Sequence, residues 1–223
     1  DKIAGEYFIK ILKCKKNVVL TLNSMNELGV LGRFIPEFGK LIAIYQHSKY
    51  HYYTVDEHTL VAIKNIENIY EKEGPLKEVL DKIQKREILY LAILFHDIGK
   101  IIHFKEHESI GAEIVERIFN RLGYDKYLNI VKFLVKNHLL MEQTAFRRNI
   151  SDLNTILDFA EKVGNIQRLN YLYLLTYADL SAVNPNVWTE WKAALLNELY
   201  QRTKNIFESK GEKISFREIT EKE

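Results

Sequence analysis

The chain has 223 residues, 47% hydrophobic and 28% charged, a composition that excludes a disordered protein and supports a sizeable core. Lysine and arginine total 32 against 30 acidic residues, and this near balance argues against a dedicated nucleic-acid binder. The single cysteine excludes a disulfide framework and fits a reducing compartment such as the cytoplasm. No apolar run is long enough to predict a membrane span.

The first half of the chain is expected to be helical, because apolar residues recur at helical spacing and breakers are few. We assign residues 1–28 to a helical lead-in. Residues 31–44 predict a helix pair broken at Pro36, and 46–53 predict a loop rich in histidine and tyrosine. Thr54 and Glu57 have the spacing of a capping box, which predicts a helix reaching about Tyr70.

The second half of the chain continues in the same way, with one buried helix expected over 88–102. Further helices are predicted over 107–122 with Gly123 as its terminator, 125–138, 151–163 with Ser151 as its cap, 166–183 and 186–209. A charged, loose tail is expected over 210–223. No alternating run with hairpin turns occurs, so the prediction is an all-α protein.

One stretch of the predicted 88–102 helix carries polar residues that an apolar core does not need. It reads Leu94-Phe95-His96-Asp97-Ile98-Gly99-Lys100, and on a helix His96 and Lys100 share a face. A buried carboxylate is costly unless a positive charge compensates it. A metal ion held by His96 and Asp97 would do so, and a partly exposed helix end with ordinary polar residues is the alternative.

Other candidate ligands come from separate predicted helices. His58 and Asp179 would join His96 and Asp97 around one ion, and His107 and His138 could hold a second ion with Asp97 between the two. Each has a simpler interpretation. His58 and His107 could be surface residues at helix starts, His138 could stabilise a helix dipole, and Asp179 could form a salt bridge.

The order His58, His96-Asp97, Asp179 resembles the signature of the HD superfamily of metal-dependent phosphohydrolases, an all-helical fold. The added His107 and His138 resemble its variant with two metal ions. Longer stretches are similar to the HD domain of bifunctional uridylyltransferase/uridylyl-removing enzymes, which act on the nitrogen-regulatory PII protein. These stretches are 29–36, 53–60, 137–141, 147–152, 171–179, 184–185, 188, 191–193 and 199–200.

This resemblance implies an HD-domain helical bundle over 29–209, with its metal site in the core. It implies one or two divalent ions (manganese, iron, magnesium or zinc), PII as partner, and removal of UMP from uridylylated PII. The chain lacks the nucleotidyltransferase and glutamine-sensing ACT domains of that family, so it is expected to be an excised HD domain or a shorter relative. Residues 101–107 also depart from the family's glycine-rich pattern.

Several residues are predicted to serve the chemistry. Metal ions would lower the pKa of a water molecule, with Asp97 bridging two ions. Lys100 could contact the phosphate, or could instead be a surface lysine with a buried stem. Arg147 and Arg148 suit phosphate oxygens, although a charge pair with Asp152 or Glu142 would also explain them. His51 is expected to line the substrate pocket.

Two other functions compete with the removal of UMP from PII. The chain could hydrolyse small nucleotides, as other HD domains do. It could also be a non-catalytic regulatory module that keeps metal ligands for stability, although such a module has no need for six ligands.

Overall fold

The computed structural model describes residues 2–42, 44, 53–184 and 187–220, with side chains described up to residue 209, and within these ranges it contains helices and no strand. The all-α prediction is therefore confirmed. Among the described residues, no helix combines the length and apolarity needed to cross a membrane. The elements are α1 (Lys2–Leu12), α2 (Val18–Glu27), α3 (Val30–Phe34), α4 (Pro36–Gly39), α5 (Val55–Ile69), α6 (Pro75–Lys82), α7 (Arg86–Phe95), the 3-10 helix η1 (Ile98–Ile101), α8 (His107–Leu122), α9 (Asp125–Lys136), α10 (Leu140–Arg147), α11 (Leu153–Val163), α12 (Ile166–Val183) and α13 (Glu190–Thr220).

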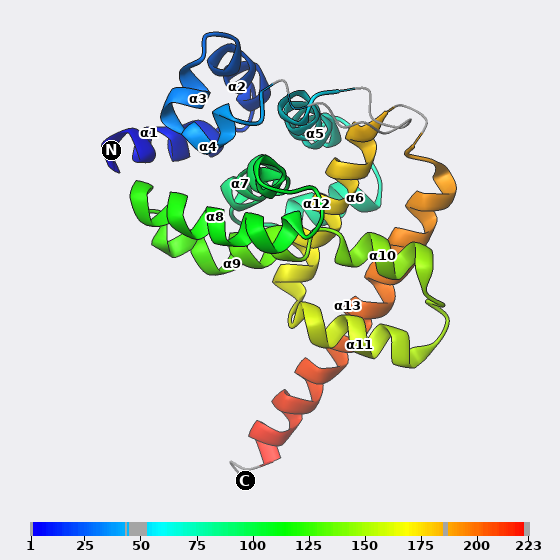
Figure 1. The fold of residues 1–223 in the computed structure, drawn as a ribbon. Coiled ribbons are helices and arrows are strands. Elements are labelled where there is room, and N and C mark those ends of the chain that lie inside the picture. Colours follow the sequence, from blue (N-terminus) through cyan, green and yellow to red (C-terminus); the bar gives the residue numbers. More distant parts are fainter. Residues whose placement is uncertain (1, 43, 45–52, 185–186, 221–223) are drawn as a thin grey trace.

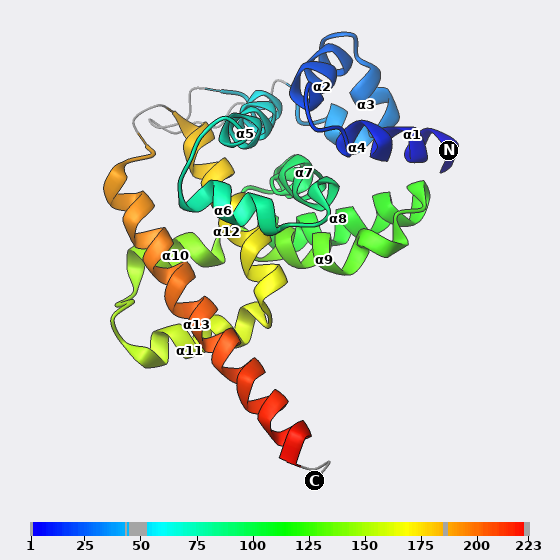
Figure 2. The ribbon, with the colours of Figure 1, turned by 180° about the vertical axis from the view of Figure 1, so that it is seen from behind.

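Helix α7 is the centre of the bundle. Every residue from Glu87 to Phe95 is buried, as expected of a helix that is apolar on all sides. It packs against α1, α5, α9 and α12, and α8 lies beside α9 (Figures 1 and 2). The functional residues discussed below lie at its carboxyl end, where these neighbouring helices meet.

Helices α1 to α4 form a separate group beside this centre, and polar contacts tie the group to it (Figure 1). The Tyr124 hydroxyl donates to the carbonyl of Gly5, joining the start of α9 to α1. The Arg121 guanidinium donates through both terminal nitrogens to the Glu37 carboxylate, at 2.7 Å each, which joins α8 to α4. These contacts fix α1 and α4 against α8 and α9.

Most helix ends follow local sequence signals. The capping box predicted at Thr54 and Glu57 is present at the start of α5. Gly123 ends α8 with a left-handed φ of 75°, as its predicted terminator role requires. The predicted cap Ser151 is wrong by one residue, because it is the Asp152 side chain that accepts from the backbone N–H of Asn154.

Three helix predictions need correction. Helix α9 ends at Lys136 rather than at residue 138, and the short α10, which was not predicted, follows. Helix α13 begins at Glu190 instead of 186 and its backbone stays helical to Thr220, through the region expected to be a loose tail. Both views show the carboxyl-terminal part of α13 extending away from the bundle (Figures 1 and 2). The predicted loop 46–53 lies outside the described residues except for Tyr53.

Candidate metal centre

The chain turns sharply at the residues that the sequence singled out. The single helix predicted over 88–102 is wrong: α7 ends at Phe95, and a 3-10 turn begins at Ile98. Packing explains the break, because a side chain at Gly99 would stand 2.0 Å from the carbonyl oxygen of His107. The close approach of α8 at Gly99 takes the backbone off the α7 axis, and Ile102 consequently lies 62% exposed.

Three histidines are held with one ring nitrogen free to face the centre of the site. The Nδ1 atoms of His96, His107 and His138 each hydrogen-bond to a backbone carbonyl, those of Ile93, Phe104 and Val135 at 2.7, 2.9 and 2.8 Å. A carbonyl can only accept, so Nδ1 carries a proton, and in the neutral imidazole Nε2 keeps its lone pair. This arrangement is the one that orients histidine ligands in metal sites. The Nε2 atoms of His107 and His138 face each other at 3.2 Å.

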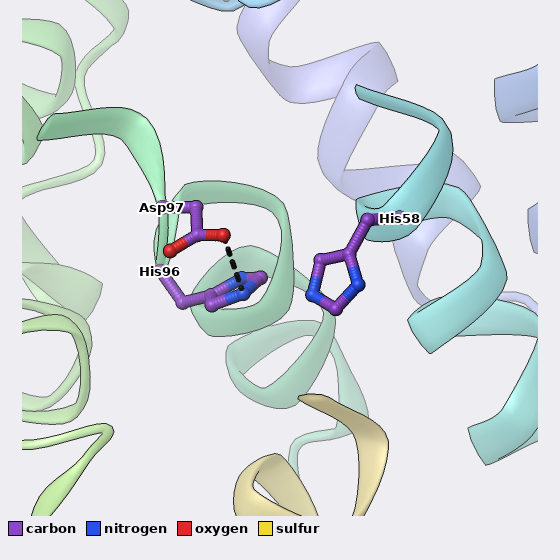
Figure 3. Close-up of side chains that lie close together, drawn as sticks. All are labelled: His58, His96 and Asp97. Atoms are coloured by element: carbon purple, nitrogen blue, oxygen red, sulfur yellow. Dashed lines mark ion pairs between the residues drawn. The ribbon is translucent and has the colours of Figure 1, made fainter. Parts of the chain in front are cut away.

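The first ligand group lies between α5, α7 and α12. His58 and His96 approach each other with Asp97 beside them, and one ligand atom from each lies within 4.8 Å of the others (Figure 3). Asp179 of α12 completes the group, since its Oδ1 lies 3.0 Å from His58 Nε2 and 3.6 Å from His96 Nε2. The structure therefore brings together residues that are more than a hundred positions apart.

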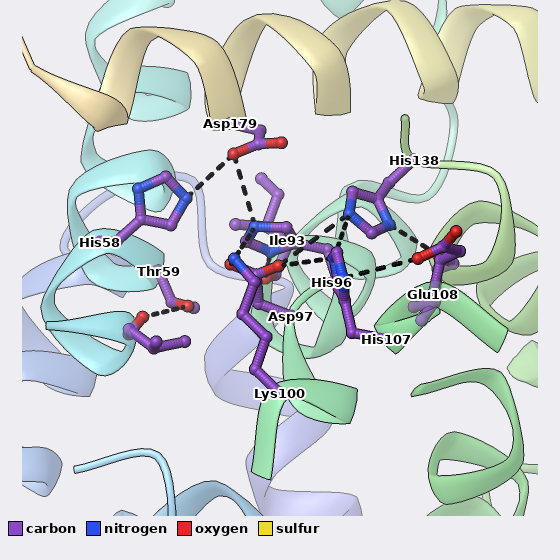
Figure 4. A network of polar contacts seen from close by, with 12 residues as sticks. His58, Thr59, Ile93, His96, Asp97, Lys100, His107, Glu108, His138 and Asp179 are labelled. Atoms are coloured by element: carbon purple, nitrogen blue, oxygen red, sulfur yellow. Dashed lines mark hydrogen bonds and ion pairs between the residues drawn. The ribbon is translucent and has the colours of Figure 1, made fainter. Parts of the chain in front are cut away.

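The second ligand group lies on the other side of Asp97 and consists of Asp97, His107 and His138 (Figure 4). Asp97 Oδ1 lies 3.3 Å from His107 Nε2 and 4.0 Å from His138 Nε2. The other carboxylate oxygen, Oδ2, lies 3.4 Å from His96 Nε2 in the first group. The two oxygens of one buried carboxylate thus face two separate sets of imidazoles.

The charges of the site depend strongly on one another. Burial lowers the pKa of His96, but the carboxylates of Asp97 and Asp179 outweigh it and raise that pKa to about 10. Burial raises the pKa of both aspartates, and the opposing charge of His96 holds each well below its usual range. Burial, followed by the charge of His96, lowers the pKa of His138 to about 4. The buried Asp97 and the partly buried Asp179 therefore stay ionised, with positive charge between them.

These residues fit a divalent metal ion. His96 Nε2 is buried and has no hydrogen-bond partner among the described residues, because the nearest carboxylate oxygens stand at 3.4 and 3.6 Å. A cation shared by the imidazole and the carboxylates would satisfy all of them at once. Imidazole and carboxylate together suit zinc, manganese or iron better than calcium.

The residues predicted to contact substrate are placed differently. Lys100 Nζ lies 2.5 Å from Asp97 Oδ2, so this lysine points into the site (Figure 4). Arg147 and Arg148 are exposed at the end of α10. Arg148 donates to Asp158 at 3.1 Å, a different acid from the two that the sequence suggested. His51 lies outside the described residues.

Two acidic residues were not predicted to belong to the site, although the sequence had suggested Glu142 as a charge partner of Arg147 or Arg148, and Arg147 does act on its carboxyl. Glu108 Oε2 lies 3.5 Å from His107 Nδ1 at the start of α8. Burial and then the charge of Asp179 raise the pKa of Glu142, which places this α10 carboxyl in the electrostatic field of the site. The signal in the sequence was their position near predicted ligands: Glu108 directly follows His107, and Glu142 lies four residues after His138.

Comparison with known proteins identifies the family. Residues 55–166 match the HD domain, and this segment contains five of the six candidate ligands, Asp179 lying beyond it. The chain belongs to the HD domain family. The predicted wider boundaries of the HD domain, 29–209, stay a prediction.

The chain is similar to a segment of larger enzymes. It is 44% identical over 210 residues to the bifunctional uridylyltransferase/uridylyl-removing enzyme of Nitrosococcus oceani, a match that covers 91% of this chain and 23% of that protein. It is 43% identical over 212 residues to the enzyme of the same name from Azospirillum brasilense, covering 92% and 23% of the two chains. The chain thus spans less than a quarter of the length of these curated relatives.

Proposed function

We propose that this HD domain is a divalent-metal-dependent phosphodiesterase that removes the uridylyl group from uridylylated PII protein. The observation that supports this most directly is the position of Asp97, whose two carboxylate oxygens face two separate groups of histidines. A pair of ions joined by one carboxylate is suited to displacement at phosphorus. The similarity to uridylyl-removing enzymes supports uridylyl as the group that leaves.

In this proposal the six ligands form two ion-binding groups. His58, His96 and Asp179 hold the first ion, and His107 and His138 hold the second, with Asp97 shared. Bound divalent ions activate a water molecule and offset negative charge on the phosphoryl oxygens. The backbone carbonyls behind His96, His107 and His138 keep the imidazoles in the tautomer that can bind a cation.

Lys100 is the residue of this chain best placed to act on the substrate. Its side chain is 12% exposed and its ammonium lies against Asp97, so a phosphate at the metal centre comes within its reach. The substrate is a tyrosine of PII that carries the uridylyl group. The Lys100 ammonium holds a phosphoryl oxygen while the bond from phosphorus to the oxygen of this tyrosine breaks. Water supplies the hydroxyl that the phosphate gains, and the proton goes to the tyrosyl oxygen.

The outer part of the substrate site involves residues further from the ions. Arg147, exposed at the end of α10, attracts the anionic substrate, and Arg148 does so after releasing Asp158. His51 lies outside the described residues, and its contact with the substrate stays a prediction. The protein partner is PII, and the compartment is the cytoplasm. The relatives are much longer than this chain, and we propose that nucleotidyltransferase and ACT domains adjoin it in a longer parent chain.

Release of UMP from uridylylated PII in the presence of manganese tests the proposal. We expect release by the wild-type chain, loss of release after chelation, and loss of release in the His96→Ala and Asp97→Asn variants. Lys105→Ala, an exposed residue of the neighbouring loop, is the matched control and retains activity. Rapid hydrolysis of free nucleotides without release from PII would instead favour a small-nucleotide phosphohydrolase.

A further inference from the structure

Trp191, in the first turn of α13, is an exposed aromatic residue that contacts α10, the helix that follows the candidate ligand His138. Its side chain is 63% exposed, and its ring stacks on that of Phe146 of α10, with centroids 6.1 Å apart and planes inclined by 23°. The other tryptophan, Trp188, is partly buried and packs edge-on against Tyr177. Phe146 thus supports an indole that remains largely open to solvent, an arrangement typical of binding surfaces.

A line of residues connects this aromatic pair to the metal ligands. Glu142 and Phe146 lie one turn apart on the same face of α10, and His138 lies four residues before Glu142, in the preceding turn. The charge of Asp179 acts on the Glu142 carboxyl, and Arg147 and Lys192 act on it with the opposite sign. Lys192 Nζ in turn lies 5.7 Å from the centre of the Phe146 ring.

We propose that Trp191 and Phe146 form an aromatic platform that binds the nucleobase of the nucleotidyl group being removed. This inference rests on the proposed function, since it places the phosphodiester at the metal ions. From Glu142 to Phe146 the α10 axis rises about 6 Å, so the platform lies about one turn further along α10 than the carboxyl on which the charge of Asp179 acts. Lys192 and Arg147 beside it complement the negative charge of a nucleotide.

The position of the platform along α10 favours the nucleobase over the tyrosyl ring, which is the other aromatic group of the substrate. In a uridylylated tyrosine, the tyrosyl ring carries the phosphate oxygen directly, so that ring must stay next to the ions. The uracil ring is separated from the phosphate by the ribose, and this spacer allows it to reach an aromatic surface further out. Base stacking on an aromatic side chain needs no hydrogen-bond donor or acceptor from the protein.

Binding of UMP and of ribose 5-phosphate to the manganese-loaded chain, measured by calorimetry, tests the platform. We expect Trp191→Ala to weaken UMP binding about tenfold, the loss typical of one base–aromatic stack. Ribose 5-phosphate lacks the base, so its affinity should not change. Trp191→Phe should restore UMP affinity, and Leu153→Ala, which alters an equally exposed apolar residue of α11, should have no effect.

The possible failures can be told apart. Equal weakening of both ligands by Trp191→Ala, with Trp191→Phe no better, would show a structural role and overturn the platform. An unchanged UMP affinity would overturn it as well, while UMP release from PII continued to support the proposed function. If the wild-type chain released no UMP from PII with manganese, the proposed function itself would fail, and the platform with it.

Discussion

The ammonium of Lys100 lies 2.5 Å from Oδ2 of Asp97, and both side chains are almost completely buried, at 12% and 4% exposed. The same oxygen faces His96 in the first ligand group. The Lys100 ammonium is therefore paired with a carboxylate oxygen of Asp97 that a metal ion would use as a ligand. The ammonium and the ion compete for Oδ2, and the positive charge of Lys100 repels any ion bound nearby.

We expect Lys100→Met to raise the affinity for manganese about tenfold while abolishing UMP release, because it removes the competing charge and the phosphate contact together. Calorimetric titration of the metal-free chain measures the affinity. Lys105→Met, in the neighbouring exposed loop, is the charge-matched control. Weaker manganese binding by Lys100→Met would mean that the lysine orients Asp97 for the metal instead.

We expect His107→Ala to reduce the bound metal from two ions per chain to one. The substitution removes a ligand of the second group, whereas His58, His96 and Asp179 remain in place. Metal content after dialysis, measured by plasma mass spectrometry, gives the number directly. Loss of both ions would show that the two groups bind as one unit, and an unchanged count would remove His107 from the ligand set.

We expect Gly99→Ala to destabilise the fold by about 3 kcal/mol, because a methyl group there would overlap the carbonyl oxygen of His107. Urea unfolding measures the loss. Gly111→Ala is the comparison, since its methyl group would meet Val135 Cγ1 at 3.1 Å, a side-chain atom that can shift. Similar losses in the two variants would contradict the importance of the contact at Gly99.

We expect Glu37→Gln to lower stability by about 0.5 kcal/mol at pH 7, because it breaks a half-exposed ion pair with Arg121. The hydrogen bond from Arg121 lowers the pKa of Glu37 below 4.5, so the folded state favours the ionised form. Its contribution is present above about pH 4.5 and is lost as the pH falls through the lowered pKa. Urea unfolding at pH 7 and at pH 3 should show the variant's deficit only at pH 7.

Local sequence signals predicted helices well where their ends are chemically marked. The capping box at Thr54 and the terminator Gly123 both lie where expected. The break after Phe95 carried no such mark, since the apolar pattern continues to Ile98. What ends α7 there is the approach of α8 to Gly99, a contact between segments that no local periodicity encodes.

The candidate site, too, was only partly predictable from the sequence. Residue chemistry and family resemblance together proposed the ligands, and the structure brings all six of them into one cluster. The pairing of Lys100 with Asp97 and the electrostatic link between Glu142 and Asp179 depend on side-chain direction across helices. Arg148 does pair with an acid, but its partner is Asp158, six residues after Asp152, and not Asp152 or Glu142.

The burial of α7 also determines how an ion can reach the ligands. The helix is enclosed along its length from Glu87 to Phe95, and His96 continues that enclosure at its end. Amide protons of α7 should therefore exchange with solvent only through global unfolding. Among the described residues of the site, Lys100, His107 and Asp179 keep 12%, 11% and 18% of their side chains exposed, so we expect an ion entering the folded chain to meet these three first.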